Sequence, residues 1–507
     1  MEIKRIAIVG GGTAGWMAAN HLGLALCQTP GLEITLIESK DVPVIGVGEG
    51  TVPRIKDTLQ KFGISEAELL RKCDATFKQG IKFANWMSPE AQPRGFYYHP
   101  FSPPYPFGYD FTPHWLNSAR SLDFDRLSDF YCVSEQKRAP KQISSPPYQG
   151  LVDYAYHFNA AKFSELLAEN AKKRFSVKHI FETVEAVHKN SEGFIASLSY
   201  ASGRGEFFDF YIDCSGFSSL LFGESLGVPF LDKSEQIKSD AALVYRRPSN
   251  EEEEISPFTF AKAHRAGWMW DIPLTNRSGL GFVYASDFMS ENEAVEAFSL
   301  QLGENVDAGD LRKVPMRIGY RKKFWEKNCV ALGLAQGFVE PLEATSILVT
   351  DFSADLIAKN FPVDIHSMQV AANHCNRVVE YTWERVIDFV QLHYYLSDRR
   401  DSDFWVENTE KASLSDVLSE RLMLWRSTPP KRTDFFSRFD IFGPENYLFV
   451  LYGMNFDTRS RPVASQDEKK FSEIAVKVQS RSREMSDSLL SHRKWLTELK
   501  KAMNNAG

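Results

Sequence analysis

Hydrophobic and polar residues first form a regular pattern at the start of the chain. Residues 6–9 (IAIV) are apolar and predict a buried strand, and the glycine-rich run GGGTAG follows directly. Apolar residues then recur at helical spacing through WMAANHLGLAL, and a second apolar strand, EITLIE, ends at Glu38. This order of strand, turn, helix and strand predicts an α/β fold.

The glycines of the turn have the spacing of a dinucleotide-binding fingerprint. Gly10, Gly12 and Gly15 satisfy G-x-G-x-x-G, which gives a tight turn, room for a pyrophosphate and close contact of helix and strand. The helix N-terminus offers free N–H groups to phosphates. Glu38 lies close to the ~20-residue offset expected for the carboxylate that binds a ribose. A glycine turn without a ligand is the alternative, and the strand, helix and acid together argue against it.

A later segment, FDFYIDCSGFSSLL, indicates which dinucleotide binds. It contains an apolar strand that runs into residues 213–216 (DCSG). Flavin-binding folds of this type return to the cofactor through a second strand and glycine, so we expect FAD. The chain holds a single G-x-G-x-x-G motif, so no second site for NAD(P)H is evident.

Two segments further along have the alternation of strands. Read as one strand, FKQGIKFANW (residues 77–86) places Lys78 and Lys82 on one face, where the pattern alone predicts solvent exposure. GWMWDIP places Trp268 and Trp270 on one face of a strand, which is the pattern of core packing. Beyond residue 455, apolar positions at helical spacing among many charges predict a long amphipathic helix.

Charge and cysteine usage exclude several classes of protein. The 507 residues include 59 basic and 66 acidic residues, a net charge of −7, so we expect no nucleic-acid partner. The six cysteines never form CxxC, and no set of His, Asp and Glu shows metal-ligand spacing, so we expect free thiols and no metal. The N-terminus enters a strand at once, and no apolar run approaches the ~20 residues of a membrane span. We therefore expect a cytoplasmic protein without a membrane partner.

Ordered blocks over roughly residues 4–455 resemble the flavin-dependent tryptophan halogenase family. The blocks are GGGTAGWMAA, GVGEGTVP, FKQGIKFANW, YAYHFNA, DCSGF, GWMWDIP, NCVALGLAQGFVEPLEATSI and DFVQLHYYLSDRRDSDFW. The W-x-W-x-I-P block joined to the glycine fingerprint is highly specific. The resemblance implies an FAD-binding, Rossmann-like module of the flavin monooxygenase type, with a mostly helical portion that covers the substrate.

The resemblance also implies a reaction. Reduced FAD and oxygen oxidise a halide, chloride or bromide, to hypohalous acid, and a lysine directs this oxidant onto an electron-rich aromatic carbon. Family members take FADH2 from a separate NAD(P)H-dependent flavin reductase, which agrees with the single dinucleotide motif. The expected partners are that reductase, a small aromatic substrate and, in a homodimer, a second copy of the chain.

The catalytic pair is assigned by resemblance. Lys78 is the lysine, whose ammonium could hold hypohalous acid or, after losing its proton, become a haloamine; partial burial would lower its pKa and assist the second. Glu343 in GFVEPLEATSI is the glutamate beside it, which accepts the ring proton or orients the oxidant. Glu340 is the rival for this role, and capping or solvation in a loop is the alternative for either acid. Lys82 is expected to remain in solvent.

Thr345 and Ser346 begin a predicted helix, where N-capping is their simplest role. A helix N-terminus also binds small anions, and in the family the backbone amides at these positions hold the halide. Ser346 stands where glycine is usual, and Ala344 stands where serine is common. Backbone donation survives both changes, so they bear on the choice of halide. If one halide alone reacts, we expect bromide, which is easier to oxidise.

Other site residues also follow from the resemblance. Trp268 and Trp270 match a wall that keeps an organic substrate from the flavin while a small halide reaches it, so that halogenation replaces oxygen insertion. The cofactor-binding residues expected are Gly10, Gly12, Thr13, Ala14, Gly15, Glu38, Val42, Val47, Gly50, Val184, Leu334 and Ile347. For the apolar members, ordinary core packing is the alternative.

The substrate pocket departs from the family pattern. His99 and Phe101 in YYHPFSP match rings that stack on the substrate, although a surface loop is the usual place for such a histidine. Tryptophan-specific members hold the amino acid with an adjacent Phe-Trp, a Glu and a Tyr pair in a C-terminal segment. Here RFDIFGPENYLFVLYGMNF offers Phe442 without a tryptophan, and Tyr447 alone of the tyrosines. We therefore predict indole or a simple derivative rather than free L-tryptophan.

Two regions are expected. Residues 1–349 would form an FAD-binding and halide module with inserted substrate-pocket segments (about 75–160), and residues 350–507 a mainly helical covering region. The function expected is FADH2- and O2-dependent halogenation of an aromatic ring. A flavin-dependent aromatic monooxygenase, which would lack halide dependence, and a non-catalytic flavin-binding protein are the alternatives.

Overall fold

The N-terminal segment forms a largely parallel sheet in the computed structural model, which describes residues 2–42, 48–105, 107–118, 120, 122–250, 252–304, 306, 308–410 and 412–506. Within these residues the strand order is β20 (Trp325–Glu326), β21 (Cys329–Ala331), β12 (Phe210–Asp213), β1 (Arg5–Val9), β2 (Glu33–Glu38) and β8 (Lys178–Phe181). Helix α1 (Thr13–Leu26) connects β1 to β2, which pair in parallel, and it packs against α6 (Ala160–Phe175) and α8 (Thr345–Lys359). The predicted α/β, Rossmann-like fold class is confirmed.

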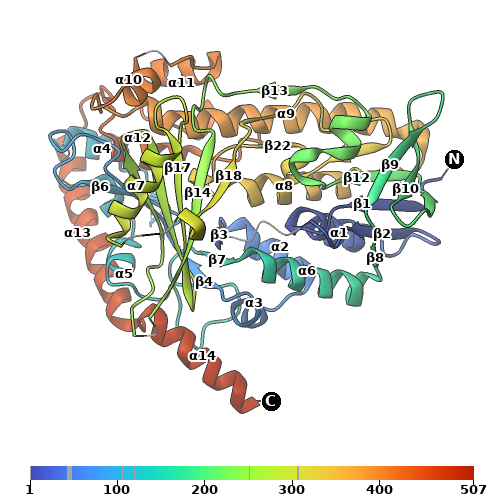
Figure 1. The fold of residues 1–507 in the computed structure, drawn as a ribbon. Coiled ribbons are helices and arrows are strands. Elements are labelled where there is room, and N and C mark those ends of the chain that lie inside the picture. Colours follow the sequence, from blue (N-terminus) through green and yellow to red (C-terminus); the bar gives the residue numbers. More distant parts are fainter. Residues whose placement is uncertain are drawn as a thin grey trace.

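A second, seven-stranded sheet stands beside the first (Figure 1). Its order in the described part of the chain is β18 (Arg312–Pro315), β14 (Ala241–Pro248), β17 (Arg277–Tyr284), β16 (Gly267–Pro273), β15 (Thr259–His264), β5 (Gly80–Ala84) and β6 (Phe96–Pro100). Neighbours are antiparallel except for β15 and β5. This sheet carries the paired tryptophans on β16.

Smaller sheets complete the strand structure. Their orders are β3 (Gly48–Gly50), β7 (Ala155–Asn159), β4 (Thr76–Lys78); β11 (Gly205–Phe207), β10 (Ile195–Tyr200), β9 (Val184–Lys189); and β13 (Phe230–Asp232), β19 (Gly319–Arg321), β22 (Gly337–Phe338). The prediction of one strand through residues 77–86 is wrong. The chain is interrupted at Gln79, whose N–H donates to Pro257 O and whose carbonyl accepts from Phe101 N–H. As a result, β4 and β5 join different sheets.

Helices predominate after residue 345. They are α8, α9 (Ile365–Tyr395), α10 (Asp403–Thr409), α11 (Asp416–Trp425), α12 (Pro444–Gly453), α13 (Ser465–Ser488) and α14 (His492–Ala506). The long α9 runs over both sheets in Figure 1, and α13 borders the opposite end from the N-terminus. The single helix predicted beyond residue 455 is two helices, because the backbone becomes extended at Leu489. The expected boundary between residues 349 and 350 falls inside α8, so that division remains a proposal.

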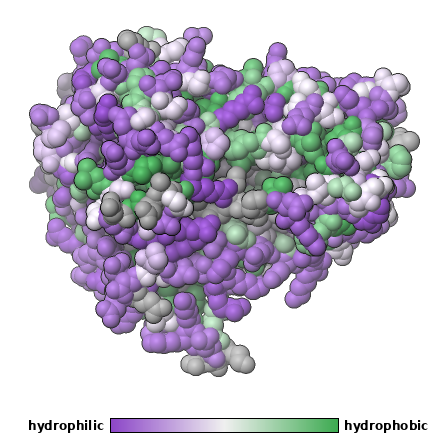
Figure 2. Space-filling model, in the orientation of Figure 1, coloured by the Kyte–Doolittle hydropathy of each residue, from purple (hydrophilic) through white to green (hydrophobic). Residues whose placement is uncertain are grey.

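Shorter helices lie among the strands of the N-terminal two-thirds. They are α2 (Arg54–Phe62), α3 (Glu66–Lys72), α4 (Thr112–Asn117), α5 (Tyr131–Glu135) and α7 (Glu291–Leu302). A large cluster of buried apolar residues connects sheets and helices. Figure 2 shows a mostly hydrophilic face with hydrophobic residues in small patches.

The six cysteines are free thiols. Among the described residues, no group of three or more His, Cys, Asp or Glu side chains could hold a metal ion. Within the same residues, no helix is both long and apolar enough to cross a membrane.

Candidate active site

The glycine turn forms a cradle between β1 and α1. Gly10 has φ +115°, and a Cβ there would lie 2.1 Å from Cys214 O, so residue 10 must be glycine. A Cβ on Gly15 would lie 1.9 Å from Gly10 O, which explains how closely the helix packs on the turn. The side of Gly12 is open, and no described side chain caps the α1 N-terminus. Free N–H groups at this helix end are suited to a phosphate.

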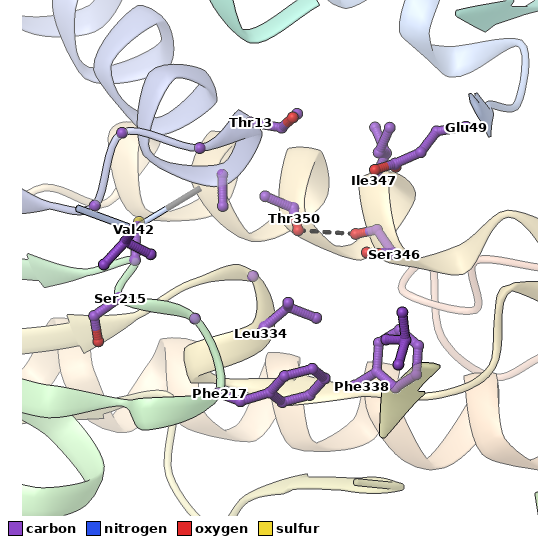
Figure 3. Close-up of a pocket in the computed structure, with 18 of the residues that line it drawn as sticks. Thr13, Val42, Glu49, Ser215, Phe217, Leu334, Phe338, Ser346, Ile347 and Thr350 are labelled. Atoms are coloured by element: carbon purple, nitrogen blue, oxygen red, sulfur yellow. Dashed lines mark hydrogen bonds between the residues drawn. The ribbon is translucent and has the colours of Figure 1, made fainter. Parts of the chain in front are cut away.

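A cavity of about 480 Å³ extends from this cradle. Of the predicted cofactor residues, those that line it are Gly10, Gly12, Thr13, Ala14, Glu38, Val42, Gly50, Val184, Leu334 and Ile347. Gly15 lies behind the turn instead, and Val47 lies outside the described residues. Figure 3 shows Val42 toward one end of the cavity, Glu49 and Ile347 toward the other, and Thr13 and Leu334 between them.

The residues that line the cavity are suited to the successive parts of FAD. The cradle would hold the pyrophosphate through backbone N–H groups, and Glu38, which is 2.9 Å from His179 Nε2, would accept a ribose hydroxyl. Apolar side chains such as Leu334 and Phe338 would border the flat ring. The volume lies in the range of ligand sites in proteins.

The first turn of α8 forms part of the cavity wall. Ala344 adopts φ 55° before the helix, and no described side chain caps the N-terminus. Ser346 lines the cavity, and Thr345 lines a second, water-sized cavity beside it. The Thr345 hydroxyl has no partner within the described residues. Uncapped N–H groups at the start of a fifteen-residue helix can bind a small anion such as a halide.

Lys78 ends β4 and lines the same cavity. Its side chain is 1% exposed, so the expectation of a solvated lysine is wrong. Burial lowers the pKa of Lys78 to about 8, and the nearby negative charge of Glu343 opposes this shift. Within the described residues it forms no ion pair or hydrogen bond; its Nζ lies 5.4 Å from the centre of the Phe101 ring. An amine of this kind can give up its proton near neutral pH.

Lys82 has a different environment, although it lies on the neighbouring strand β5. Its Nζ lies 3.0 Å from Glu135 Oε1 and 3.8 Å from the centre of the Phe96 ring. Its side chain is half-buried rather than free in solvent. An ion-paired lysine away from the cavity is not suited to the same chemistry.

Glu343 is held by two histidines at the end of the short 3-10 turn η6 (Pro341–Glu343). His99 Nδ1 lies 2.9 Å from Oε1, and His393 Nε2 lies 2.9 Å from the same oxygen. Burial disfavours the carboxylate most strongly, yet the two imidazoles outweigh it and hold the pKa of Glu343 at about 2. Asn446 Nδ2 donates to His99 Nε2 at 3.0 Å, so His99 presents its Nδ1–H to Glu343. Glu343 is therefore a fixed anion.

Glu340 is a different kind of acid. It is fully buried and accepts a hydrogen bond from the Tyr394 hydroxyl at 2.6 Å. Burial raises its pKa to about 7. Neither acid lines the cavity, and of the two only Glu343 acts electrostatically on Lys78.

The tryptophan pair divides between the cavity and the core. Both indoles are buried on β16, with ring centres 5.8 Å apart. Trp270 lines the cavity, and Trp268 does not. A Cβ on Gly281 of β17 would lie 2.0 Å from the Trp270 ring, so this glycine makes space for the indole. Trp270 alone is a direct wall of the cavity.

The predicted substrate residues separate into two groups. Phe442 stacks on Phe389 with ring centres 4.0 Å apart, and Tyr447 and His99 also contact Phe389 at 4.9 and 5.9 Å. The structure thus brings these three together around one ring. The Phe101 ring lies next to Lys78 instead, with its centre 5.4 Å from Nζ.

Sequence reasoning missed several residues of the site. Glu49 lines the cavity, and burial raises its pKa to about 7. Thr259 also lines it. Three residues that do not line the cavity contact its neighbours: His157 contacts Thr259, His393 contacts Glu343, and Asn446 donates to His99. Polar residues inside apolar runs, such as His157 in AYHF, were the available signal.

Comparison with known proteins agrees with this geometry. The family model for tryptophan halogenase matches residues 5–468. Tryptophan 7-halogenase RebH from Lentzea aerocolonigenes is 32% identical over 98% of this chain and 99% of its own length.

Solved structures give the same result. The tryptophan halogenase from Shewanella frigidimarina NCIMB 400 has a TM-score of 0.93 at 36% identity, over 99% of this chain and 98% of its own. BrvH, a flavin-dependent halogenase from Brevundimonas sp. BAL3, has a TM-score of 0.87 at 30% identity, over 98% and 99%. The chain belongs to the tryptophan halogenase family of flavin-dependent enzymes.

Proposed function

We propose that this halogenase acts on an electron-rich aromatic ring, indole or a simple derivative, through hypohalous acid that Lys78 directs. The observation that carries the proposal is a buried lysine on the cavity wall with a pKa of about 8, near a fixed anion. Reduced FAD with O2 supplies the oxidising equivalents that convert halide to hypohalous acid.

Each residue has a distinct part in this proposal. The N–H groups at Thr345 and Ser346 hold the halide at the cavity wall. Lys78 binds the oxidant by hydrogen bonding, or as a haloamine once it has lost its proton. Glu343 stabilises positive charge on the attacked ring and takes up the ring proton, directly or through His99. Trp270 keeps the aromatic substrate out of the flavin cavity.

Reduced flavin comes from a separate NAD(P)H-dependent reductase in this proposal. The single glycine fingerprint supports it, since a self-reducing enzyme would need a nicotinamide site as well. The residues around Phe389 support a compact aromatic substrate. Phe442 and Tyr447 pack on that ring instead of offering groups to the ammonium and carboxylate of an amino acid.

The direct test is one incubation of the protein with FAD, a generic flavin reductase, NADH, O2, halide and an equimolar mixture of indole and L-tryptophan. Mass analysis should find halogenated indole in excess over halogenated tryptophan, and more product with bromide than with chloride. A strong preference for tryptophan contradicts the substrate assignment. A hydroxylated product that forms without halide indicates a monooxygenase. If neither indole nor tryptophan is consumed, the protein binds flavin but lacks this activity.

The lysine is tested by Lys78→Ala. Ring halogenation should fall by at least about 100-fold while oxidation of reduced flavin continues, because the oxidant still forms but is no longer directed. Lys82→Ala is the matched control, since it removes a lysine three residues beyond Gln79, on β5, and this lysine is paired with Glu135. Halogenation retained in Lys78→Ala contradicts the proposed role.

A further inference from the structure

Three strands bring polar residues together around the buried lysine. In the small sheet, His157 of β7 is in register with Gly50 of β3 and with Thr76 of β4. Lys78 follows Thr76 by two residues, so its side chain is on the same face of β4. Thr259 begins β15 in the neighbouring sheet and lines the cavity together with Lys78.

Hydrogen bonds fix the orientation of this group. The Thr76 hydroxyl donates to Pro273 O at 2.6 Å, so it can only accept from His157 Nδ1, which lies 3.4 Å away. The Nδ1 of His157 therefore carries the proton, and its Nε2 is an acceptor. Thr259 Oγ1 lies 2.9 Å from that Nε2, so the Thr259 hydroxyl must donate to it.

His157 is also neutral, as this arrangement requires. The ring is fully buried, and burial together with the charge of Lys78 holds its pKa well below the usual value. Because the single proton of the Thr259 hydroxyl is committed to His157, both of its lone pairs remain free to accept.

Thr259 and the lysine border the same glycine, although no hydrogen bond joins them in this structure. A Cβ on Gly50 would be 3.1 Å from Lys78 Nζ and 3.4 Å from Thr259 Oγ1, so both atoms border the same bare glycine. The ammonium has three protons and, within the described residues, no hydrogen-bond partner. The titratable groups around it are Glu343 from η6, His157 from β7 and Glu49 of β3, which lines the same cavity, while His492 of α14 acts on His157.

We propose that Thr259, oriented by neutral His157, is the hydrogen-bond acceptor that Lys78 Nζ takes up when its side chain turns toward Gly50, and that this contact positions the amine on the cavity wall. Thr259 is a positioning residue: it acts through the lysine and not on the substrate. The inference rests on the proposed function of Lys78. It assigns the Thr76–His157–Thr259 chain a purpose, namely to present an oxygen that can only accept to an amine that needs one.

The test compares Thr259→Val, which keeps the shape and loses the hydroxyl, with Thr259→Ser, which keeps the hydroxyl. Thr382→Val is the matched control, because this buried hydroxyl on α9 has no partner in the described part of the chain. The first readout is acetylation of Lys78 as a function of pH, measured by mass spectrometry of its peptide. The second is the ratio of halogenated indole to hypohalous acid captured by a β-diketone trap.

Thr259→Val should move the acetylation midpoint of Lys78 down by about one pH unit, because the ammonium loses a charged hydrogen bond. It should also lower the product-to-trap ratio about tenfold. Thr259→Ser and Thr382→Val should behave like the wild type. An unchanged midpoint in Thr259→Val, or equal loss in the serine variant, overturns the inference.

A second variant covers the case in which Thr259→Val fails to bind FAD. If Thr259→Val does not bind FAD, the same measurements are made on Thr259→Ala, which adds no methyl group next to His157. The acetylation midpoint does not depend on turnover. A wild type that makes no halogenated product therefore refutes the proposed function, while the midpoint still decides whether Thr259 contacts Lys78.

Discussion

Lys78 and Glu343 are both buried, yet their pKa shifts favour the neutral form of the lysine and the charged form of the glutamate. Burial disfavours charge on both. Glu343 is compensated by two imidazoles at 2.9 Å and remains an anion, whereas Lys78 lacks such a partner and its pKa falls to about 8. The groups that face each charge, and not the depth of burial, decide which group keeps its charge.

This coupling gives a prediction for Glu343→Gln. The carboxylate raises the pKa of Lys78, so replacing it with a neutral amide should lower that pKa below 8. The amine form then becomes available at lower pH, and acetylation of Lys78 should begin at lower pH than in the wild type. Glu340→Gln is the control, because Glu340 is paired with Tyr394 away from the lysine. A midpoint that does not move in Glu343→Gln would show that the two groups are uncoupled.

Some residues of the site could be predicted from sequence and others could not. Lys78 and Glu343 belong to short sequence blocks that are specific to the halogenase family. His393 and Thr259 come from segments 50 and 181 positions away from these residues, and their place depends on how helix α9 and strand β15 pack. No local pattern carries that information, because hydrophobic periodicity reports the face of an element and not its neighbour.

At the scale of elements, the cradle depends on a backbone that only glycine allows. In Gly10→Ala a Cβ would lie 2.1 Å from Cys214 O at a φ of +115°, so we expect a loss of about 3 kcal/mol in stability and no FAD binding. Gly12→Ala is the contrasting change, since its side is open and its φ is −76°. That variant should keep its melting temperature and bind FAD more weakly, as measured by flavin fluorescence. Equal melting temperatures for the two variants would contradict this reading.

The first βαβ unit was predictable because strand, turn and helix signals follow one another within forty residues. The interruption between β4 and β5 was not. Alternation continues through Gln79, and only the partners of its backbone, Pro257 O and Phe101 N–H, reveal the change of sheet. Each pairing involves a residue distant in sequence. As a result, Lys78 ends strand β4 of one sheet while Lys82 belongs to strand β5 of another.

At the scale of the whole molecule, the C-terminal helix α14 supports the strand that carries the lysine. His492 Nε2 accepts from Phe77 N–H at 2.9 Å, and its Nδ1 lies 3.2 Å from Ile255 O. Burial lowers the pKa of His492 to about 3, so the ring stays neutral and keeps this acceptor. Trp495 packs against the Phe77 ring with centres 4.9 Å apart. The family match ends at residue 468, before this helix begins.

His492→Ala should therefore weaken both the fold and the reaction. It leaves the buried Phe77 N–H without a partner and opens a cavity, at a cost of about 2–4 kcal/mol. We expect a lower melting temperature in calorimetry and a smaller share of oxidant delivered to indole. His188→Ala, which removes an exposed histidine on β9, should change neither. An unaltered melting temperature in His492→Ala would show that α14 is not needed by β4.

The contact between α14 and β4 joins residues 415 positions apart. During translation, the strand that carries Lys78 leaves the ribosome 415 residues ahead of the histidine that accepts from Phe77 N–H. A copy shortened by premature termination or by proteolytic trimming of the tail keeps its glycine cradle but lacks that acceptor. Synthesis of α14 is thus a condition for the assembly of the strand that carries Lys78.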